Sequence, residues 1–253
     1  MHAPTVYLAH LPKTPPQGTL DCIDHDKAPP LLISFAFKDV WEQVRARTRC
    51  RDWVLDSGAF TAKSTGMTID VNEFIEYAVH MKQTDSRLSA VFALDVIGDP
   101  VASLANAERM WEAGIEAIPC FHLGSDWKHL RELLRYPRIA IGGAARRAPK
   151  VKNAFAAEVF KRAWPKRIHG FGYGSQRLVM QYPWYSVDAS SWSVGTRYAA
   201  WHSLVSRGSM RGTVKARIPN AGARMHGEIE TFARLERAAR SKWRHTWASV
   251  SAQ

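Results

Sequence analysis

The chain has 253 residues, a hydrophobic content of 46% and a formal net charge of +12. The apolar content excludes a disordered chain, and no window approaches the ~18 uninterrupted apolar residues of a membrane span. No basic segment leads into an apolar stretch at the N-terminus, so we expect a cytoplasmic protein, in the host cytoplasm if a phage encodes it. The charge favours nucleic acid as a partner, with a merely soluble basic protein as the alternative.

Short apolar runs alternate with helical runs along the chain. Eight strands are expected, over residues 6–9, 31–35, 53–56, 91–95, 117–121, 138–143, 167–172 and 185–188. Most are continuously apolar, as in a parallel sheet covered on both faces. Strand–helix alternation predicts an α/β fold, and eight strands favour a closed (β/α)₈ TIM barrel over an open doubly wound sheet. A barrel of this kind takes ~250 residues, so residues 1–253 are expected to form a single domain.

Residues that are typical of helix starts lie between the expected strands. Asp70 with Glu73 resembles a capping box, Asp99 is followed by Pro100 at the first helical position, and Asp126 opens another helix. Further helices are expected over about 151–163 and 195–205, and a basic C-terminal helix over about 226–248.

The segment 10–30 holds five prolines and no helical period. It predicts a long loop, which either covers the barrel mouth or means that the first strand is misassigned. The three cysteines, Cys22, Cys50 and Cys120, show no C-x-x-C spacing, so neither a disulfide framework nor a zinc knuckle is indicated. We expect them to be reduced core residues, and we expect no cofactor and no metal.

Carboxylates end three of the expected strands: Asp56, Asp95 and Asp188. The strand ends meet at one mouth of a barrel, where the active sites of this fold lie. One carboxylate can attack an anomeric carbon while another manages the protons of the leaving group, so the set indicates glycosyl chemistry. For each aspartate alone, a helix N-cap is the competing interpretation.

Glycines and a histidine follow the remaining strands. Gly142, Gly143 and Gly170 either leave backbone bare beside a flat ligand or simply permit tight turns. His122 follows the fifth strand, and a single histidine in such a place is more often structural than catalytic.

Five strings, in this order, resemble the tRNA-guanine transglycosylase superfamily. They are DSGAF at 56–60, FALD at 92–95, IAIGGA at 139–144, HGFGYG at 169–174 and YSVDASSW at 185–192. The similarity spans roughly residues 53–192 and is greatest to the phage and bacterial branch that inserts 7-deazaguanine bases into DNA.

The resemblance implies a pentosyltransferase that exchanges guanine in DNA for a 7-deazaguanine such as 7-cyano-7-deazaguanine. Asp188 would be the nucleophile that forms a covalent glycosyl-aspartate, and Asp56 the general acid/base. The base would be bound by Asp95, Ser57, Phe60, His122, Gly142, Gly143 and Gly170.

The chain departs from the tRNA enzymes in two places. No cysteine follows Cys120, so the zinc site near their C-terminus is absent, which argues for a polymer other than tRNA. Their glutamine after the fifth strand is replaced by Phe121 or His122, which changes how the 7-substituent is recognised.

Basic residues are expected to contact phosphates, and the target base must then leave the stack. After the sixth strand these residues are Arg146, Arg147, Lys150 and Lys152. On the last helix they are Arg234, Arg237, Arg240, Lys242 and Arg244, where a solvated helix face explains them equally well. The alternatives are a tRNA-guanine transglycosylase, a non-catalytic nucleic-acid-binding barrel and a small-sugar glycosidase; whether the protein forms a homodimer is left open.

Overall fold

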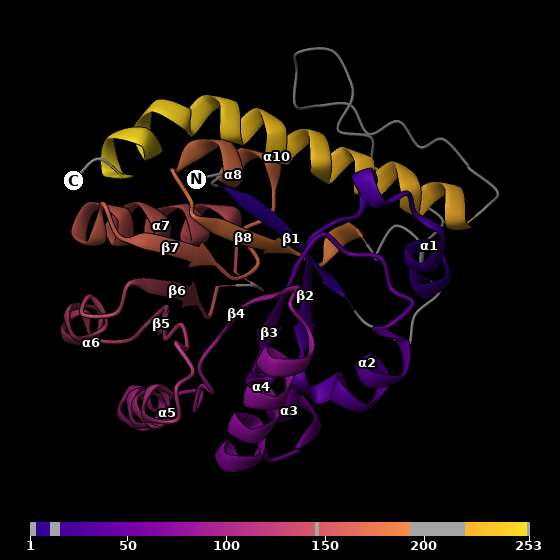
Figure 1. Ribbon diagram of the computed structural model, residues 1–253. Coiled ribbons are helices and arrows are strands. Elements are labelled where there is room, and N and C mark those ends of the chain that lie inside the picture. The colour runs from indigo at the N-terminus through magenta and orange to yellow at the C-terminus, as the bar shows by residue number, and fades with distance from the viewer. Residues whose placement is uncertain (1–3, 11–15, 145–146, 193–220, 252–253) are drawn as a thin grey trace.

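The computed structural model describes residues 4–10, 16–144, 147–192 and 221–251. Eight parallel strands form one sheet in the order β4-β3-β2-β1-β8-β7-β6-β5. Their bounds are β1 (Thr5–His10), β2 (Leu31–Ser34), β3 (Trp53–Asp56), β4 (Leu88–Val91), β5 (Cys120–His122), β6 (Arg138–Gly142), β7 (Arg167–Gly170) and β8 (Ser186–Ala189). Because β1 pairs with β8, the sheet curls round into the expected (β/α)₈ TIM barrel (Figure 1).

The seam of the barrel lies between β4 and β5. A single parallel bridge joins Phe92 to Ile118, whereas the other neighbouring strands share ladders. Around it, Ala93 N donates to Ile118 O at 2.9 Å and Ile118 N donates to Val91 O at 2.8 Å. The expected bounds of the fourth strand (91–95) and the fifth (117–121) are therefore wrong, since apolar runs mark burial and not ladder pairing.

Helices surround the sheet (Figure 1). They are α1 (Pro16–Cys22), α2 (Lys38–Val44), α3 (Ala59–Thr65), α4 (Val71–Thr84), α5 (Pro100–Glu112), α6 (Trp127–Leu133), α7 (Pro149–Ala163), α8 (Gln176–Gln181) and α10 (Ala221–Ser251), with 3-10 turns η1 (His25–Lys27) and η2 (Phe35–Phe37). Asp70, Asp99 and Asp126 are confirmed as N-caps, because each carboxylate accepts backbone N–H groups of the first helical turn. The helix expected over 195–205 lies outside the described residues.

Residues 10–30 are not the structureless loop that their prolines predict, because they contain α1 and η1. Proline at the first position of a helix costs no hydrogen bond, so Pro16 can begin α1. Leu20 is fully buried, and Thr19 Oγ1 lies 3.7 Å from Met225 Sδ on α10. Tertiary contacts thus stabilise a helix that is too short to show a period.

The last helix, α10, is confirmed and runs past both ends of its expected range, 226–248. Its buried stripe includes a charged residue, Glu236. The Glu236 carboxylate accepts hydrogen bonds from Val6 N and Arg51 Nη1, each at 2.8 Å, and pairs with Arg240 at 2.8 Å. Val6 and Arg51 lie at the amino ends of β1 and β3, so this part of α10 crosses the end of the barrel opposite to the ends that carry Asp56 and Asp188.

Two basic residues of α10 are used within the protein. Arg240 Nε donates to Pro4 O at 3.0 Å, and Lys242 Nζ donates to Met180 O at 2.7 Å. These contacts favour the structural alternative over the nucleic-acid role for both side chains. Within the described ranges, no helix combines the length and apolar character that a membrane span requires.

The barrel interior is filled by its own small apolar cluster. Its buried members are Tyr7, Leu32, Val54, Phe92, Ile118 and Ala140. Side chains two positions apart on a strand face the same side, so the residue two places after an interior residue also points inward. Ser34, Asp56 and Gly142 follow in this way at the carboxyl ends of β2, β3 and β6. Because side chains alternate between the two faces of a strand, polar side chains and the backbone of a glycine lie at the carboxyl-end mouth of the barrel.

Candidate active site

A cavity of about 1140 Å³ opens at the carboxyl ends of the strands. Most of the site residues expected from sequence line it: Asp56, Ser57, Phe60, Asp95, His122, Gly142, Gly143, Arg147 and Asp188. These residues come from segments spread over much of the chain, so the cavity is the place where the predicted convergence occurs.

Asp56 ends β3, immediately before the turn into α3. Gly58 makes this turn with φ of 78°, and a Cβ on Gly58 would lie 2.6 Å from Ser34 Oγ, so no side chain fits there. Gly58 N donates to Asp56 Oδ2 at 3.1 Å. Burial raises the pKa of Asp56 to about 7, with the Gly58 N–H lowering it and the charge of Asp188 raising it further. A carboxyl group with a pKa near neutrality can both donate and accept a proton.

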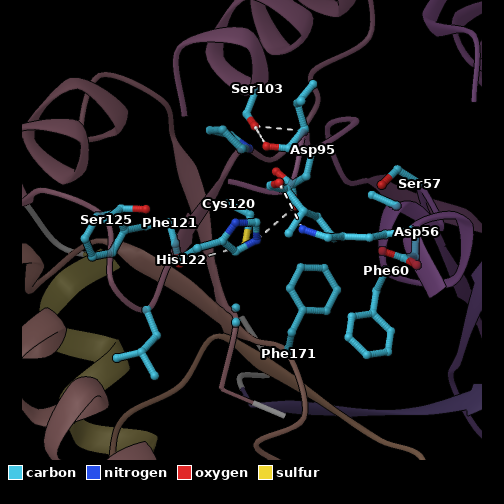
Figure 2. A pocket seen from close by; sticks show the side chains of 18 of the residues that line it. Asp56, Ser57, Phe60, Asp95, Ser103, Cys120, Phe121, His122, Ser125 and Phe171 are labelled. Atoms are coloured by element: carbon cyan, nitrogen blue, oxygen red, sulfur yellow. Dashed lines mark hydrogen bonds and ion pairs between the residues drawn. The ribbon is translucent and has the colours of Figure 1, made fainter. Parts of the chain in front are cut away.

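Asp95 lies beyond β4 and points at the imidazole of His122 (Figure 2). Asp95 Oδ2 is 3.2 Å from His122 Nε2. Burial, and after it the charge of Asp56, raises the pKa of Asp95 well above its ordinary value, and burial lowers the pKa of His122. Both shifts favour the neutral forms of the two side chains. His122 belongs to the cavity and is not a remote structural histidine.

Cys120 is a site residue that the sequence did not reveal. It is partly exposed and lines the cavity beside His122, whereas Cys50 alone fits the expected buried type and Cys22 is exposed. Cys120 and His122 are two positions apart on β5 and face the same side, whereas Phe121 is buried against Trp127 and Phe155. The C-x-H spacing at a strand end was the available signal.

Asp188 lies on β8, and its carboxylate is held from one side. Gly172 N donates to Asp188 Oδ1 at 2.6 Å, and His169 Nε2 lies 3.6 Å from the same oxygen. His169 Nδ1 contacts Ser186 Oγ at 2.9 Å. The string HGFGYG includes His169, but no role followed for it from sequence; the structure places it directly behind Asp188.

Phe171 lines the cavity and packs against the buried rings of Phe92 and His169. Ring centroids of Phe92 and Phe171 are 4.7 Å apart, those of His169 and Phe171 are 4.6 Å apart, and those of Phe92 and His169 are 4.5 Å apart. Figure 2 shows Phe171 and Phe60 together on one side of the Asp95–His122 pair. Phe60 is 56% exposed, which is high for a phenylalanine.

The structure does not bring every expected residue to the cavity. A Cβ on Gly170 would lie 2.7 Å from Trp184 Cζ3, so this glycine serves packing against a buried tryptophan. Lys152 Nζ donates to Gly172 O at 3.0 Å, which commits it to the loop that holds Asp188. Lys150 is exposed in the first turn of α7, outside the cavity wall, and Arg146 lies outside the described residues.

Neither a protein-family model nor a curated protein sequence matches this chain. Among solved structures, the chain is similar to a mutant tryptophan synthase alpha-subunit from the hyperthermophile Pyrococcus furiosus, with a TM-score of 0.50 and 11% identity over 90% of this chain and 96% of that chain. It is also similar to the YdjI aldolase from Escherichia coli K12, with a TM-score of 0.49 and 8% identity over 96% of this chain and 91% of that chain. At such identities the first likeness supports the barrel fold alone, and the second carries no argument.

Proposed function

We propose that this protein is a DNA guanine transglycosylase of the tRNA-guanine transglycosylase superfamily. It would exchange guanine in DNA for a free 7-deazaguanine base such as 7-cyano-7-deazaguanine. The observation that carries the proposal is that the carboxyl groups of Asp56 and Asp188, on β3 and β8, line one cavity with different surroundings. Two carboxyl groups in unlike environments suit separate roles in glycosyl transfer.

Asp188 acts as the nucleophile. Both contacts to its carboxylate among the described residues fall on Oδ1, from Gly172 N and His169. Oδ2 is then the oxygen that attacks C1′ of the nucleotide, forming an ester bond as the C1′–N9 bond to guanine breaks. The held oxygen keeps the carboxylate in one orientation, which favours in-line attack.

Asp56 manages the proton. In its neutral form it gives its proton to the departing guanine, and the resulting carboxylate takes a proton from the incoming 7-deazaguanine as that base attacks C1′ and releases Asp188. The pKa of about 7 suits a group that must serve in both forms near neutral pH. The two half-reactions balance, so no further reactant is needed.

The cavity supports recognition of a flat heterocycle. Phe60 and Phe171 offer faces for stacking, while Asp95 and the backbone at Gly142 and Gly143 line the wall where base edges would bind. The volume of about 1140 Å³ exceeds the ~300–1,000 Å³ of typical small-ligand pockets, in keeping with a flipped nucleotide that is still attached to its strand.

The polymer would be held by electrostatic attraction. Arg147 lies at the cavity wall and Lys150 is exposed nearby on α7, and the net charge is +12. Phosphate contacts of this kind act on any sequence and weaken with salt.

The direct test is incorporation of radiolabelled guanine or 7-cyano-7-deazaguanine into duplex DNA, single-stranded DNA and tRNA by the purified protein. Label in DNA that is abolished by Asp188→Asn supports the proposal. Label in tRNA alone would move the assignment to a tRNA enzyme. Failure to label any polymer over a range of salt concentrations, with DNA binding unaffected by Asp188→Asn and Asp56→Asn, would leave a non-catalytic nucleic-acid-binding barrel.

A further inference from the structure

Three side chains with metal-binding atoms gather at one point of the cavity wall. The carboxylate of Asp95, the thiol of Cys120 and the imidazole of His122 place one ligand atom each within 4.8 Å of one another (Figure 2). Asp95 Oδ2 and His122 Nε2 are 3.2 Å apart. Ligand atoms of a tetrahedral zinc ion, bound at ~2.0–2.3 Å, lie ~3.3–3.8 Å from one another, so the group is close to zinc-binding dimensions.

The backbone holds two of these ligands in fixed relation. Cys120 and His122 leave β5 on the same side, and Asp95 approaches from the segment that follows β4. This segment and β5 flank the seam, where the bridge between Phe92 and Ile118 is the only strand pairing among the described residues. An ion bound there would tie the two sides of the seam together.

Gly142 makes room for the group from the neighbouring strand. It is the register partner of His122 on β6. A Cβ on Gly142 would lie 2.9 Å from His122 Cδ2 and 3.0 Å from Cys120 Sγ, so any side chain would displace both ligands. The absence of a side chain at this position therefore permits the thiol and the imidazole to approach each other.

We propose that Asp95, Cys120 and His122 bind one zinc ion, with the fourth position open to the cavity. Thiolate, imidazole and carboxylate are all ligands that zinc accepts, and three protein ligands with one open position are typical of catalytic zinc sites. On binding, the Cys120 thiol releases its proton to solvent, and so does the Asp95 carboxyl group where it is protonated. The fourth position takes water or a nitrogen or oxygen atom of a heterocycle in the cavity. The site differs from the C-terminal cysteine cluster of the tRNA enzymes, and it does not rest on the proposed function.

Metal binding is measured directly on the full chain. After treatment with a chelator, zinc is added back, excess is removed by dialysis, and the metal content is measured by mass spectrometry. We expect one zinc per chain, and competition with a chromophoric chelator gives the affinity. Cobalt in place of zinc should produce a thiolate-to-cobalt charge-transfer band.

Variants locate the ion. Cys120→Ser should remove the cobalt band and weaken zinc binding by about 100-fold or more, since loss of an outer partner alone costs ~10–100-fold. Gly142→Ala should weaken zinc binding although it removes no ligand. Cys22→Ser is the matched control. It replaces an exposed cysteine that is distant in sequence from the three ligands, and it should leave the cobalt band and the zinc affinity unchanged. Zinc should raise the melting temperature of the unmodified protein and not that of Cys120→Ser, and circular dichroism checks that each variant folds.

Two results would overturn the proposal: no stoichiometric metal retained, or zinc retained equally by Cys120→Ser and by His122→Gln. The outcome is separable from base exchange, because Asp188→Asn should bind zinc normally while losing the exchange reaction. If the protein binds zinc but exchanges no base, the zinc site is supported and the proposed function is rejected. If it exchanges bases but binds no zinc, the proposed function is supported and the zinc site is rejected.

Discussion

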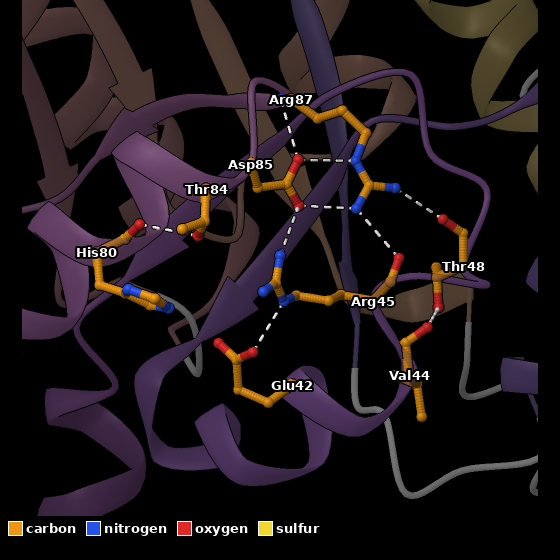
Figure 3. A network of polar contacts seen from close by, with 8 residues as sticks. All are labelled: Glu42, Val44, Arg45, Thr48, His80, Thr84, Asp85 and Arg87. Carbon is orange, nitrogen blue, oxygen red and sulfur yellow. Dashed lines mark hydrogen bonds and ion pairs between the residues drawn. The ribbon is translucent and has the colours of Figure 1, made fainter.

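The barrel buries carboxyl groups at both of its ends, and their surroundings differ. At the amino end, Asp85 lies between α4 and β4 and accepts hydrogen bonds from Arg87 Nε at 2.9 Å and Arg87 Nη2 at 2.7 Å. Arg87 also donates to the carbonyl groups of Thr48 and Arg45, which ties the loop before β3 to the loop before β4 (Figure 3). Burial raises the pKa of Asp85, but the Arg87 hydrogen bonds outweigh it and the pKa is lowered.

At the carboxyl end, burial acts without such compensation. Asp56 and Asp95 are both desolvated, the charge of Asp188 raises the pKa of Asp56, and the charge of Asp56 raises the pKa of Asp95. Their pKa values are raised where that of Asp85 is lowered. The contrast teaches that burial alone does not set the direction of a pKa shift; the hydrogen bonds from Arg87 decide it for Asp85.

The largest expected effect concerns the nucleophile. Asp188→Asn should lower base exchange by at least ~10⁴-fold, because an amide cannot replace the carboxylate that is proposed to form the glycosyl ester. The measurement is incorporation of labelled base into DNA, with the melting temperature as a check on folding. Asp26→Asn, at an exposed position, is the control. A residual rate above a tenth of that of the unmodified protein would exclude Asp188 as the nucleophile.

The next effect concerns the amino end. Asp85→Asn should lower the free energy of unfolding by about 3 kcal/mol, because it leaves the Arg87 guanidinium partly buried without its anion. Base exchange per folded molecule should stay unchanged. Urea unfolding measures the loss, and the double variant with Arg87→Gln should recover part of it. A loss under ~1 kcal/mol would show that the pair is no better than a surface ion pair.

The two ends should also respond to pH in opposite directions, measured on metal-free protein. The raised pKa of Asp56 means that its contribution to stability is present below ~4 and is lost as pH rises through about 7. The stability of Asp56→Asn relative to the unmodified protein should therefore rise as the pH rises from ~4 to 7, and it should level off above that at a gain of roughly 4 kcal/mol. The lowered pKa of Asp85 has the reverse sign, so its contribution is present above ~4 and is lost in acid.

Urea unfolding at several pH values gives both slopes. Burial raises the pKa of Asp56, the backbone N–H groups of Gly58 and Ser57 lower it, and the charge of Asp188 raises it, so Asp188→Asn should shift its apparent pKa downward. Parallel slopes for Asp56→Asn and Asp85→Asn would contradict the comparison between the two ends.

The smallest effect concerns nucleic-acid binding. Arg147→Ala should weaken DNA binding a few-fold and reduce the slope of log affinity against log salt by ~0.9, the loss of one phosphate contact. Arg244→Ala, an exposed change on α10, should leave binding unchanged, because that helix crosses the opposite end of the barrel. Equal losses for the two variants would place DNA elsewhere than at the cavity mouth.

Local patterns were sufficient for the architecture. Apolar runs of strand length, helix caps such as Asp70 and Asp99, and the position of Asp56 and Asp188 at strand ends predicted a TIM barrel with acids at one mouth. They predicted ladder bounds poorly at the seam, and they missed short helices such as α1, which are stabilised by contacts distant in sequence.

What only the tertiary structure decided is which groups meet and which are already occupied. Nothing local in the sequence tells that Asp95 meets His122, that His169 stands behind Asp188, or that Lys152 is held by Gly172. The reason is physical: helix and strand periods and N-caps arise from interactions over a few residues, which a single sequence records. Desolvation, ion pairing and ligand geometry depend on distances between segments far apart along the chain, and only the closed barrel sets those distances.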